Sequence, residues 1–279
     1  METLERDGAK LVLYAEAPDW EGRAMAVAKV KFPSVEAGAA LLNEAAERAC
    51  AVGAVGLIGP MEGDTWHSYR LVVESDGRPA FLMEPTSGPH DLAAFEAAGF
   101  ERIGGYFSAA VPLDEIAAKP EPAPQDALSV SHWDGSDPEA LFAQVHALSC
   151  EAFAGNAFYK PIGLEDFLAM YMPVVPLLKP EMILFARDGA GDLKGFLFGI
   201  PNYAEGPGTD TAILKTYASL QKGAGYLLSD AFYRAALGLG YKTALHALIH
   251  DDNLSALRSA ANGAEVFRRY ALMGRRFDG

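Results

Sequence analysis

The sequence is poor in cysteine, in long apolar runs and in positive charge, and each shortage excludes a class of protein. Cys50 and Cys150 are the only two cysteines in 279 residues. This excludes a disulfide scaffold and favours a reduced, cytoplasmic compartment. No uninterrupted apolar run reaches the roughly 18 residues that a membrane helix needs. The N-terminus, METLERDGAK, is charged where a secretory signal would be apolar.

Basic residues number 23 against 37 acidic ones, which gives a formal net charge of −14. Nucleic-acid binding requires clustered Lys and Arg, so we expect no nucleic-acid partner. An acidic surface attracts a cationic amine, although the same charge also serves simply to keep a protein soluble. Half of the residues are hydrophobic, which is enough for one large core or two modest ones. The sequence leaves the oligomeric state open.

A proline-rich stretch divides the chain. Ala117 to Gln125, AAKPEPAPQ, alternates Pro with small and charged residues and cannot form a helix. We therefore expect a first domain over 1–116, a linker over 117–126 and a second domain over 127–279. The second domain is predicted to hold elements in the following order: strand 128–132, helices 138–150 and 164–171, and strands 182–187, 193–200 and 211–219. The turn cluster 188–192 predicts a hairpin.

The most informative segment follows, from Thr211 to Arg276. Strand 211–219 leads through the glycine-bearing loop 221–225 into a helix over 226–237. A second strand over 243–250 and a helix that begins at Asn253 come next. A loop with exposed backbone N–H groups at the start of a helix favours an anion, because the orphan amides and the helix dipole both attract negative charge. The segment therefore predicts a phosphate-binding site.

This segment resembles the coenzyme A-binding core of the GNAT superfamily of N-acyltransferases. Gly223 and Gly225 fill the two small positions of the family's Gln/Arg-x-x-Gly-x-Gly/Ala loop, whereas Leu220 stands at the first position, with Gln221 one place late. Asn253-x-x-Ala256 matches the motif that opens the family's next helix. The resemblance implies a mixed α/β (α+β) fold with a mixed sheet.

The resemblance also implies an activity: transfer of an acetyl or other acyl group from acyl-CoA to a primary amine of a small molecule or peptide. In the family a main-chain N–H of the fourth strand polarises the acyl carbonyl, which here corresponds to 217–220. The residues that the resemblance places at the cofactor are Ala218, Ser219, Gln221, Lys222, Gly223, Ala224, Gly225, Tyr226 and Asn253. No metal site is expected, since His246 and His250 have no further ligands at suitable spacing.

The family's usual general acid is a tyrosine seven residues after the motif asparagine, and here that position is Ala260. Ser259 and Tyr270 are the candidates to replace it. For the general base, His250 at the end of strand 243–250 is the candidate, because a histidine titrates in the useful range. In the alternative interpretation, residues 250–252 only form a turn and cap before the Asn253 helix.

The first domain resembles a faded copy of the second. Residues 41–45 with Arg48 align with 227–231 and Arg234 at an offset of 186 (234 minus 48). Two GNAT-like domains in tandem are therefore expected. No phosphate loop precedes Leu41, so the first copy is expected not to hold coenzyme A. Two unrelated amphipathic helices are the alternative.

Polar and aromatic residues gather between Gly59 and Arg70. We expect Trp66 and Tyr69, with Tyr159 from the later loop 156–161, to bind the acceptor substrate, and Arg70 or Glu84 to recognise a substrate charge. In the alternative, this segment is a hairpin with an aromatic core, and Arg70 and Glu84 form an ion pair.

Two other functions fit a GNAT resemblance. Some tandem members transfer amino acids from aminoacyl-tRNA without coenzyme A, but the acidic charge and the retained Gly-x-Gly loop count against that. A regulator that binds coenzyme A without catalysis is the other, because the tyrosine is missing at Ala260.

Overall fold

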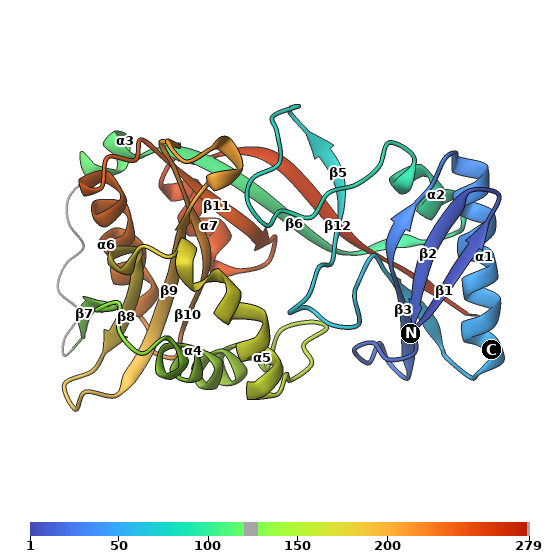
Figure 1. Ribbon diagram of the computed structural model, residues 1–279, viewed down its shortest axis with the longest axis horizontal. Helices are drawn as coiled ribbons and strands as arrows, with labels where there is room; N and C mark the ends of the chain where they lie inside the picture. The colour runs from blue at the N-terminus through green and yellow to red at the C-terminus, as the bar shows by residue number, and fades with distance from the viewer. Residues whose placement is uncertain (120–127, 278–279) are drawn as a thin grey trace. The chain divides into compact units, whose positions relative to one another are not determined.

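The computed structural model describes residues 1–119 and 128–277 and has the expected mixed α/β fold (Figure 1). From residue 120 on, the expected linker lies outside the described residues. The chain forms two compact units. The first consists of Met1–Phe107, Asn156–Lys160 and Arg268–Gly279, and the second of Ser108–Gly155 and Pro161–Phe267. In the described part of the chain, no helix is both long and apolar enough to cross a membrane.

The units do not divide where the proline-rich stretch suggested. They divide between Phe107 and Ser108, within strand β6 (Glu101–Pro112), and again within strand β12 (Glu265–Arg276). Each of these strands has 12 residues and contributes to both units. Composition marks where the backbone is unlikely to form a helix, but it carries no information on which strands pair over long sequence distances.

The first unit is a sheet with strand order β1-β2-β3-β4-β12 and β5 paired to β12. β3 and β4 are parallel and are joined by helix α1, whereas β1–β2, β2–β3 and β4–β12 are antiparallel. The bounds are β1 (Glu2–Arg6), β2 (Ala9–Tyr14), β3 (Ala24–Lys31), α1 (Val35–Ala51), β4 (Gly56–Gly59), β5 (Leu71–Ser75) and α2 (Asp91–Ala97).

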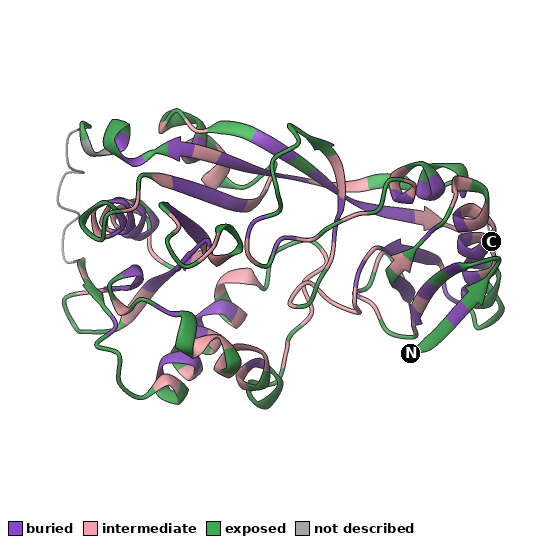
Figure 2. Cartoon of the chain, turned by 45° about the horizontal axis from the view of Figure 1, so that its top comes forward, coloured by how far each residue is buried: buried purple, intermediate pink, exposed green. Residues whose placement is uncertain are grey.

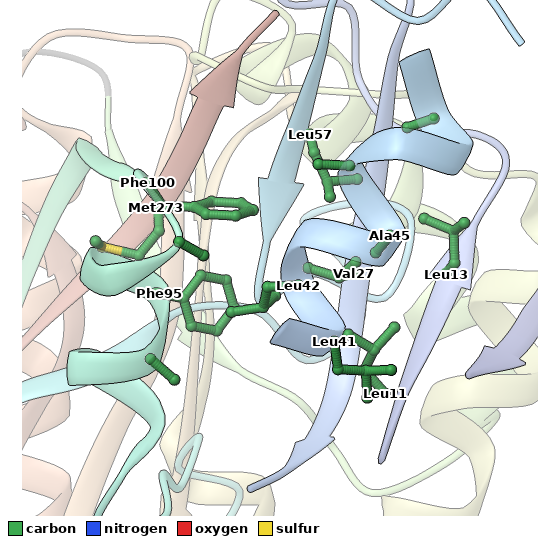
Figure 3. Packing of buried hydrophobic residues seen from close by; sticks show 14 of the residues in the cluster. Leu11, Leu13, Val27, Leu41, Leu42, Ala45, Leu57, Phe95, Phe100 and Met273 are labelled. Atoms are coloured by element: carbon green, nitrogen blue, oxygen red, sulfur yellow. The ribbon is translucent and has the colours of Figure 1, made fainter. Parts of the chain in front are cut away.

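The core of the first unit lies between α1 and the sheet (Figure 3). The buried positions of α1 recur every three or four residues, which places them on one face of the helix. Leu41 and Leu42 are fully buried there, and each contributes about 1.5–3 kcal/mol by leaving water. They pack in one cluster with β2, β3, β4, α2 and β12, through Leu11, Leu13, Val27, Leu57, Phe95, Phe100 and Met273.

The second unit contains a sheet with strand order β11-β10-β9-β8-β7, in which β10 and β11 alone are parallel. The turn 188–192 joins β8 and β9 as the expected hairpin. The bounds are α3 (Leu113–Ala117), β7 (Ser129–His132), α4 (Pro138–Phe153), α5 (Leu164–Tyr171), β8 (Ile183–Arg187), β9 (Leu193–Pro201), β10 (Thr211–Ser219), α6 (Ala224–Gly238), β11 (Thr243–His250) and α7 (Leu254–Ala261). Short 3-10 helices occur at Met172–Leu177, Pro180–Met182 and Tyr203–Glu205.

Helices α6 and α4 cover opposite faces of this second sheet. Leu197 of β9 belongs to the buried cluster that contains Leu228 and Phe232 of α6. The ring of the next residue, Phe198, lies 5.8 Å from that of Phe142 on α4. Since successive strand side chains point to opposite faces, the two helices sandwich the sheet. Figure 2 shows the resulting buried strands and inner helix faces in purple.

The two units repeat one arrangement, because α1 joins the parallel strands β3 and β4 as α6 joins β10 and β11. The buried residues of the two helices correspond at an offset of 187 (225 minus 38), one more than the sequence alignment gives. They are Gly38, Leu41, Leu42, Ala45, Ala46 and Ala49 in α1, and Gly225, Leu228, Ser229, Phe232, Tyr233 and Ala236 in α6. The identical residues in the sequence alignment include exposed ones, and packing does not constrain which exposed positions of the two helices correspond.

Candidate functional site

The N-terminus of α6 is open to an anion. Gly223 is its N-cap, with a φ of 91° that a residue with a Cβ rarely adopts. No side chain caps the helix, and its first turn carries no acidic residue. Over the described ranges, no acceptor is bonded to the backbone N–H of Lys222, Gly223 or Gly225. Unpaired donors of this kind and the positive end of a helix dipole both attract an anion, as the sequence predicted for this loop.

Arg258 of α7 adds a positive charge at the same place. A Cβ on Gly225 would lie 2.5 Å from Nη1 of Arg258 and 3.1 Å from Cε2 of Tyr217. Glycine is therefore required at Gly225 for space, whereas Gly223 is required for its backbone conformation. Nη1 of Arg258 donates to the Tyr217 hydroxyl at 3.5 Å. A guanidinium beside a helix N-terminus is unfavourable by itself and becomes favourable when an anion lies between them.

Next to this loop, β10 and β11 separate. They pair over Thr211–Leu214 and Thr243–His246, although β10 continues to Ser219 and β11 to His250. β10 has an irregularity between Leu214 and Thr216, and Leu248 of β11 has a φ of 57°. The paired register of the two strands ends at Leu214 and His246. The segment 217–220, where the GNAT resemblance implied the donor to the acyl carbonyl, lies beyond the end of this pairing.

The other residues predicted at the cofactor lie around the same loop. Ala218 and Ser219 end β10, Gln221 and Lys222 lie in the loop, and Tyr226 is exposed in the first turn of α6. Asn253 is the N-cap of α7, where its side chain accepts from the backbone N–H of Ser255 at 3.0 Å. Its carboxamide oxygen thus serves the helix, and its role toward a cofactor stays a prediction.

His250 takes part in the turn that was the alternative interpretation. Nδ1 of His250 accepts from the backbone N–H of Asp252 at 3.1 Å, and the His250 carbonyl accepts from the N–H of Asn253 at 3.0 Å. With Nδ1 as an acceptor, the neutral ring carries its proton on Nε2 and has no spare lone pair for a base. A role as general base requires this contact to break, and it stays a prediction.

A buried polar network that the sequence pattern did not indicate joins α6, β11 and α7. His246 is the last residue of β11 paired to β10, and its Nε2 lies 2.8 Å from the Tyr233 hydroxyl. Its Nδ1 lies 2.8 Å from Oγ of Ser259, and the Asn262 amide donates to Tyr233 at 3.2 Å. Burial lowers the pKa of His246 to about 4, so the ring is neutral at pH 7. The hydroxyl of Ser259, a candidate acid, is thus hydrogen-bonded to His246.

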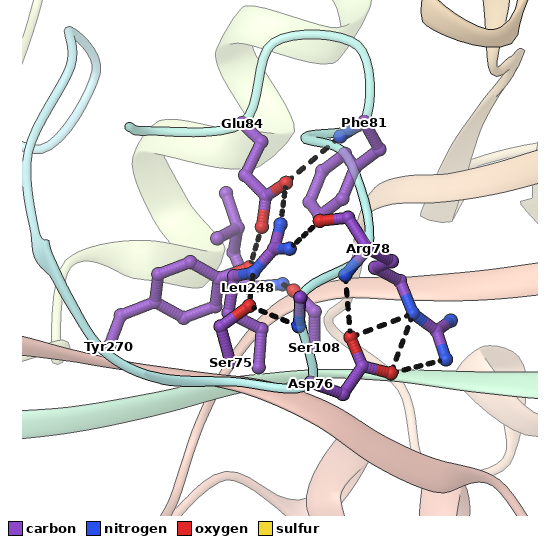
Figure 4. Close-up of polar contacts among 10 residues, drawn as sticks. Ser75, Asp76, Arg78, Phe81, Glu84, Ser108, Leu248 and Tyr270 are labelled. Atoms are coloured by element: carbon purple, nitrogen blue, oxygen red, sulfur yellow. Dashed lines mark hydrogen bonds and ion pairs between the residues drawn. The ribbon is translucent and has the colours of Figure 1, made fainter. Parts of the chain in front are cut away.

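Tyr270, the other candidate acid, lies in the first unit. It is 1% exposed, and its hydroxyl donates to the carboxylate of Glu84 (Figure 4). Glu84 also accepts from Nη1 of Arg268 at 2.5 Å and from the backbone N–H of Phe81 at 2.9 Å. The ion-pair partner of Glu84 is therefore Arg268, so the Arg70–Glu84 pair of the alternative interpretation does not form. These contacts explain Tyr270 as a core residue, and nothing in them supports its catalytic assignment.

The residues predicted to bind the acceptor separate into two groups within the first unit. Nε1 of Trp66 donates to the carbonyl of Lys160 at 2.7 Å, and the ring of Trp66 lies 6.1 Å from that of Tyr159. Tyr69 instead packs edge-on against Tyr106, with ring centroids 5.8 Å apart.

In the first unit, the helix that corresponds to α6 is closed to an anion. Oγ of Ser34 caps α1 by accepting from the backbone N–H of Ala37 at 3.2 Å, and Glu36 adds a negative charge to the first turn. At Gly38, which corresponds to Gly225, a Cβ would lie 2.7 Å from the Phe32 ring and from Cβ of Ala94. Apolar atoms thus fill the place that Arg258 has in the second unit. This supports the expectation that coenzyme A binds only in the second unit.

Comparison with known proteins identifies the fold. No family model matches the sequence, and neither does any curated protein. Solved structures do match. A GCN5-related N-acetyltransferase from Sphaerobacter thermophilus superposes with a TM-score of 0.58 at 15% identity, covering 97% of this chain and 78% of that one. A tandem GNAT protein from the clavulanic acid biosynthesis pathway gives 0.57 at 18% identity, covering 98% and 81%. The chain therefore has the fold of GNAT acyltransferases, a tandem protein among them.

Proposed function

We propose that the second unit binds acyl-CoA and transfers its acyl group, most simply acetyl, to a primary amine of a small molecule or peptide. The observation that carries this proposal is the uncapped N-terminus of α6, which adjoins strands that separate after Leu214 and His246. A helix N-terminus with free amides suits a pyrophosphate. Two parallel strands that separate leave main-chain donors available to an acyl thioester. The solved structures with this fold that are named as N-acetyltransferases support the reaction class.

The residues present fit coenzyme A. The amides of Lys222, Gly223 and Gly225 would hold the pyrophosphate, and Arg258 would neutralise part of its charge. The missing Cβ at Gly225 leaves room for close approach. Bound there, coenzyme A would supply an activated thioester carbonyl.

The chain itself supplies position and polarisation. A main-chain N–H near the end of β10, within 217–220, would be the donor for the carbonyl oxygen, as an oxyanion site requires. A thiol with a pKa of about 8.5 leaves readily, so the reaction tolerates Ala260 in place of a tyrosine.

Direct attack by the amine is favoured over an acyl-enzyme. Cys150 of α4 lies 3.4 Å from Nε2 of His146, but that nitrogen donates to the Ile162 carbonyl at 2.8 Å. The imidazole therefore does not draw the proton from the thiol.

The decisive experiment measures thiol release from acetyl-CoA over a panel of primary amines, with calorimetry of coenzyme A binding in parallel. We expect binding, and release that depends on one class of amine. Binding without release by any amine would favour the second candidate, a regulator that binds coenzyme A, for which Ala260 is the supporting observation. The absence of binding would refute both.

A further inference from the structure

Arg70 is a buried cation in contact with two tyrosine rings of the first unit, which are nearly perpendicular to each other. Its guanidinium carbon lies 4.0 Å from the ring centroid of Tyr69 and 4.1 Å from that of Tyr106. Arg70 is 9% exposed. Its Nη2 donates to the Tyr69 hydroxyl, whereas its Nε is buried with no hydrogen-bond partner.

The carboxylates close to Arg70 in sequence all pair with other groups. Glu62 lies 3.0 Å from Nζ of Lys29, and Asp64 lies 2.8 Å from Nδ1 of His67. Glu84 binds Arg268, as described above. Within residues 1–119 and 128–277, no carboxylate lies within ion-pair distance of the Arg70 guanidinium. A buried charge without a counter-ion is costly, and tyrosine faces offset only part of that cost.

The backbone of Arg70 is also strained. Its φ is 89°, a left-handed conformation that glycine adopts without penalty and arginine does not. The backbone N–H of Arg70 donates to the Pro60 carbonyl at 3.0 Å, and the adjacent Tyr69 forms an antiparallel β-bridge with Met61. The hairpin thus holds a large cation at a position that favours glycine. Strain of this kind is retained where the side chain has a use.

We propose that Arg70, Tyr69 and Tyr106 form a carboxylate-binding site in the first unit. A guanidinium fork binds a carboxylate through two parallel N–H···O bonds. A phosphate usually takes several cations or a helix N-terminus, and the nearby Lys29 is paired with Glu62. Carboxylate binding at Arg70 does not depend on the proposed function.

The test compares ligands that differ only in the carboxylate. Calorimetry on the full chain, without coenzyme A, uses the pairs lysine and lysinamide, phenylalanine and phenylalaninamide, and acetate and acetamide, with inorganic phosphate as a separate arm. We expect at least one acid to bind tenfold or more tightly than its amide. Arg70→Met, which keeps the side-chain length, is expected to abolish the difference, and Arg70→Lys to restore part of it.

Equal affinity for every acid and its amide, no binding of any acid, or a preference that persists in Arg70→Met would each overturn the site. Tighter binding of phosphate than of every carboxylate would also overturn it. If Arg70→Met does not fold by circular dichroism, Arg70→Gly, which relieves the left-handed backbone, takes its place. Carboxylate binding without thiol release would leave this site standing and refute the proposed function.

Discussion

The hydroxyl of Tyr233 lies 2.8 Å from Nε2 of His246, and this contact joins α6 to β11 inside the second unit. With Ser259 on the other ring nitrogen, His246 is a neutral hydrogen-bonding group at the point where β10 and β11 begin to separate. The network fixes three elements that meet beside the proposed acyl site. Its role is therefore structural, and its charge state governs the acid stability of the unit.

We expect stability to fall as the pH drops from about 6.5 to about 4, because His246 has its ordinary pKa of 6.5 when unfolded and a pKa of about 4 when folded. In this window the unfolded chain takes up a proton and the folded chain does not, which amounts to about 3 kcal/mol at the lower end. Denaturant unfolding at several pH values checks this. His246→Gln should flatten the slope relative to the parent. Parallel slopes in the two proteins would contradict the prediction.

Gly225→Val is expected to weaken coenzyme A binding at least tenfold, because its side chain meets Arg258 and Tyr217 in the space that the ligand approaches. Gly238→Val is the matched control, since Gly238 ends the same helix and no atom lies within 4 Å of a Cβ built there. Calorimetry compares the two. Tight binding by Gly225→Val would place the ligand elsewhere.

Arg258→Gln is expected to lower coenzyme A affinity and reduce its salt dependence, because one cation facing the pyrophosphate is removed. Without ligand the same change should not destabilise the protein, since a positive charge near a helix N-terminus costs about 0.3–1 kcal/mol. Arg234→Gln is the control, because Arg234 pairs with Asp230 on α6. Equal affinities in both variants would remove Arg258 from the site.

Glu84→Gln is expected to destabilise the first unit by about 3–5 kcal/mol, because it leaves the Arg268 guanidinium buried without its counter-ion. The control is Glu74→Gln, whose partner Arg269 lies 3.7 Å away on the surface, and a loss below about 1 kcal/mol is expected there. Chemical denaturation measures both. Similar losses in both variants would show that burial of the Glu84–Arg268 pair does not increase its contribution to the free energy of unfolding.

The sequence alone predicted the features that depend on residues close together in the chain. The Gly223 loop, the helix after it and the 188–192 hairpin each carry their signals within a few positions, and the structure has all of them. The glycine spacing also indicated the GNAT fold. Periodic burial along α6 follows from the same local pattern.

What escaped prediction depends on distant residues. Tyr270 was a plausible acid by its place after the Asn253 helix, but its partner Glu84 lies 186 residues away in sequence. The network at His246 needs one residue from each of three elements, and none of them has a distinctive spacing. Arg70 and Glu84 were natural partners by charge alone, and only the fold shows that Arg268 takes that place.

Strand β12 sets the order in which this protein is completed during translation. Its residues 271 and 273 lie in the core of the first unit, and it pairs there with both β4 and β5. The sheet that β1 to β5 begin can therefore close only after β12, nearly 200 residues later than β5, has been made. Until then β4 has an unpaired edge, which is prone to aggregate. Most of the first unit is thus made well before the strand that completes its sheet.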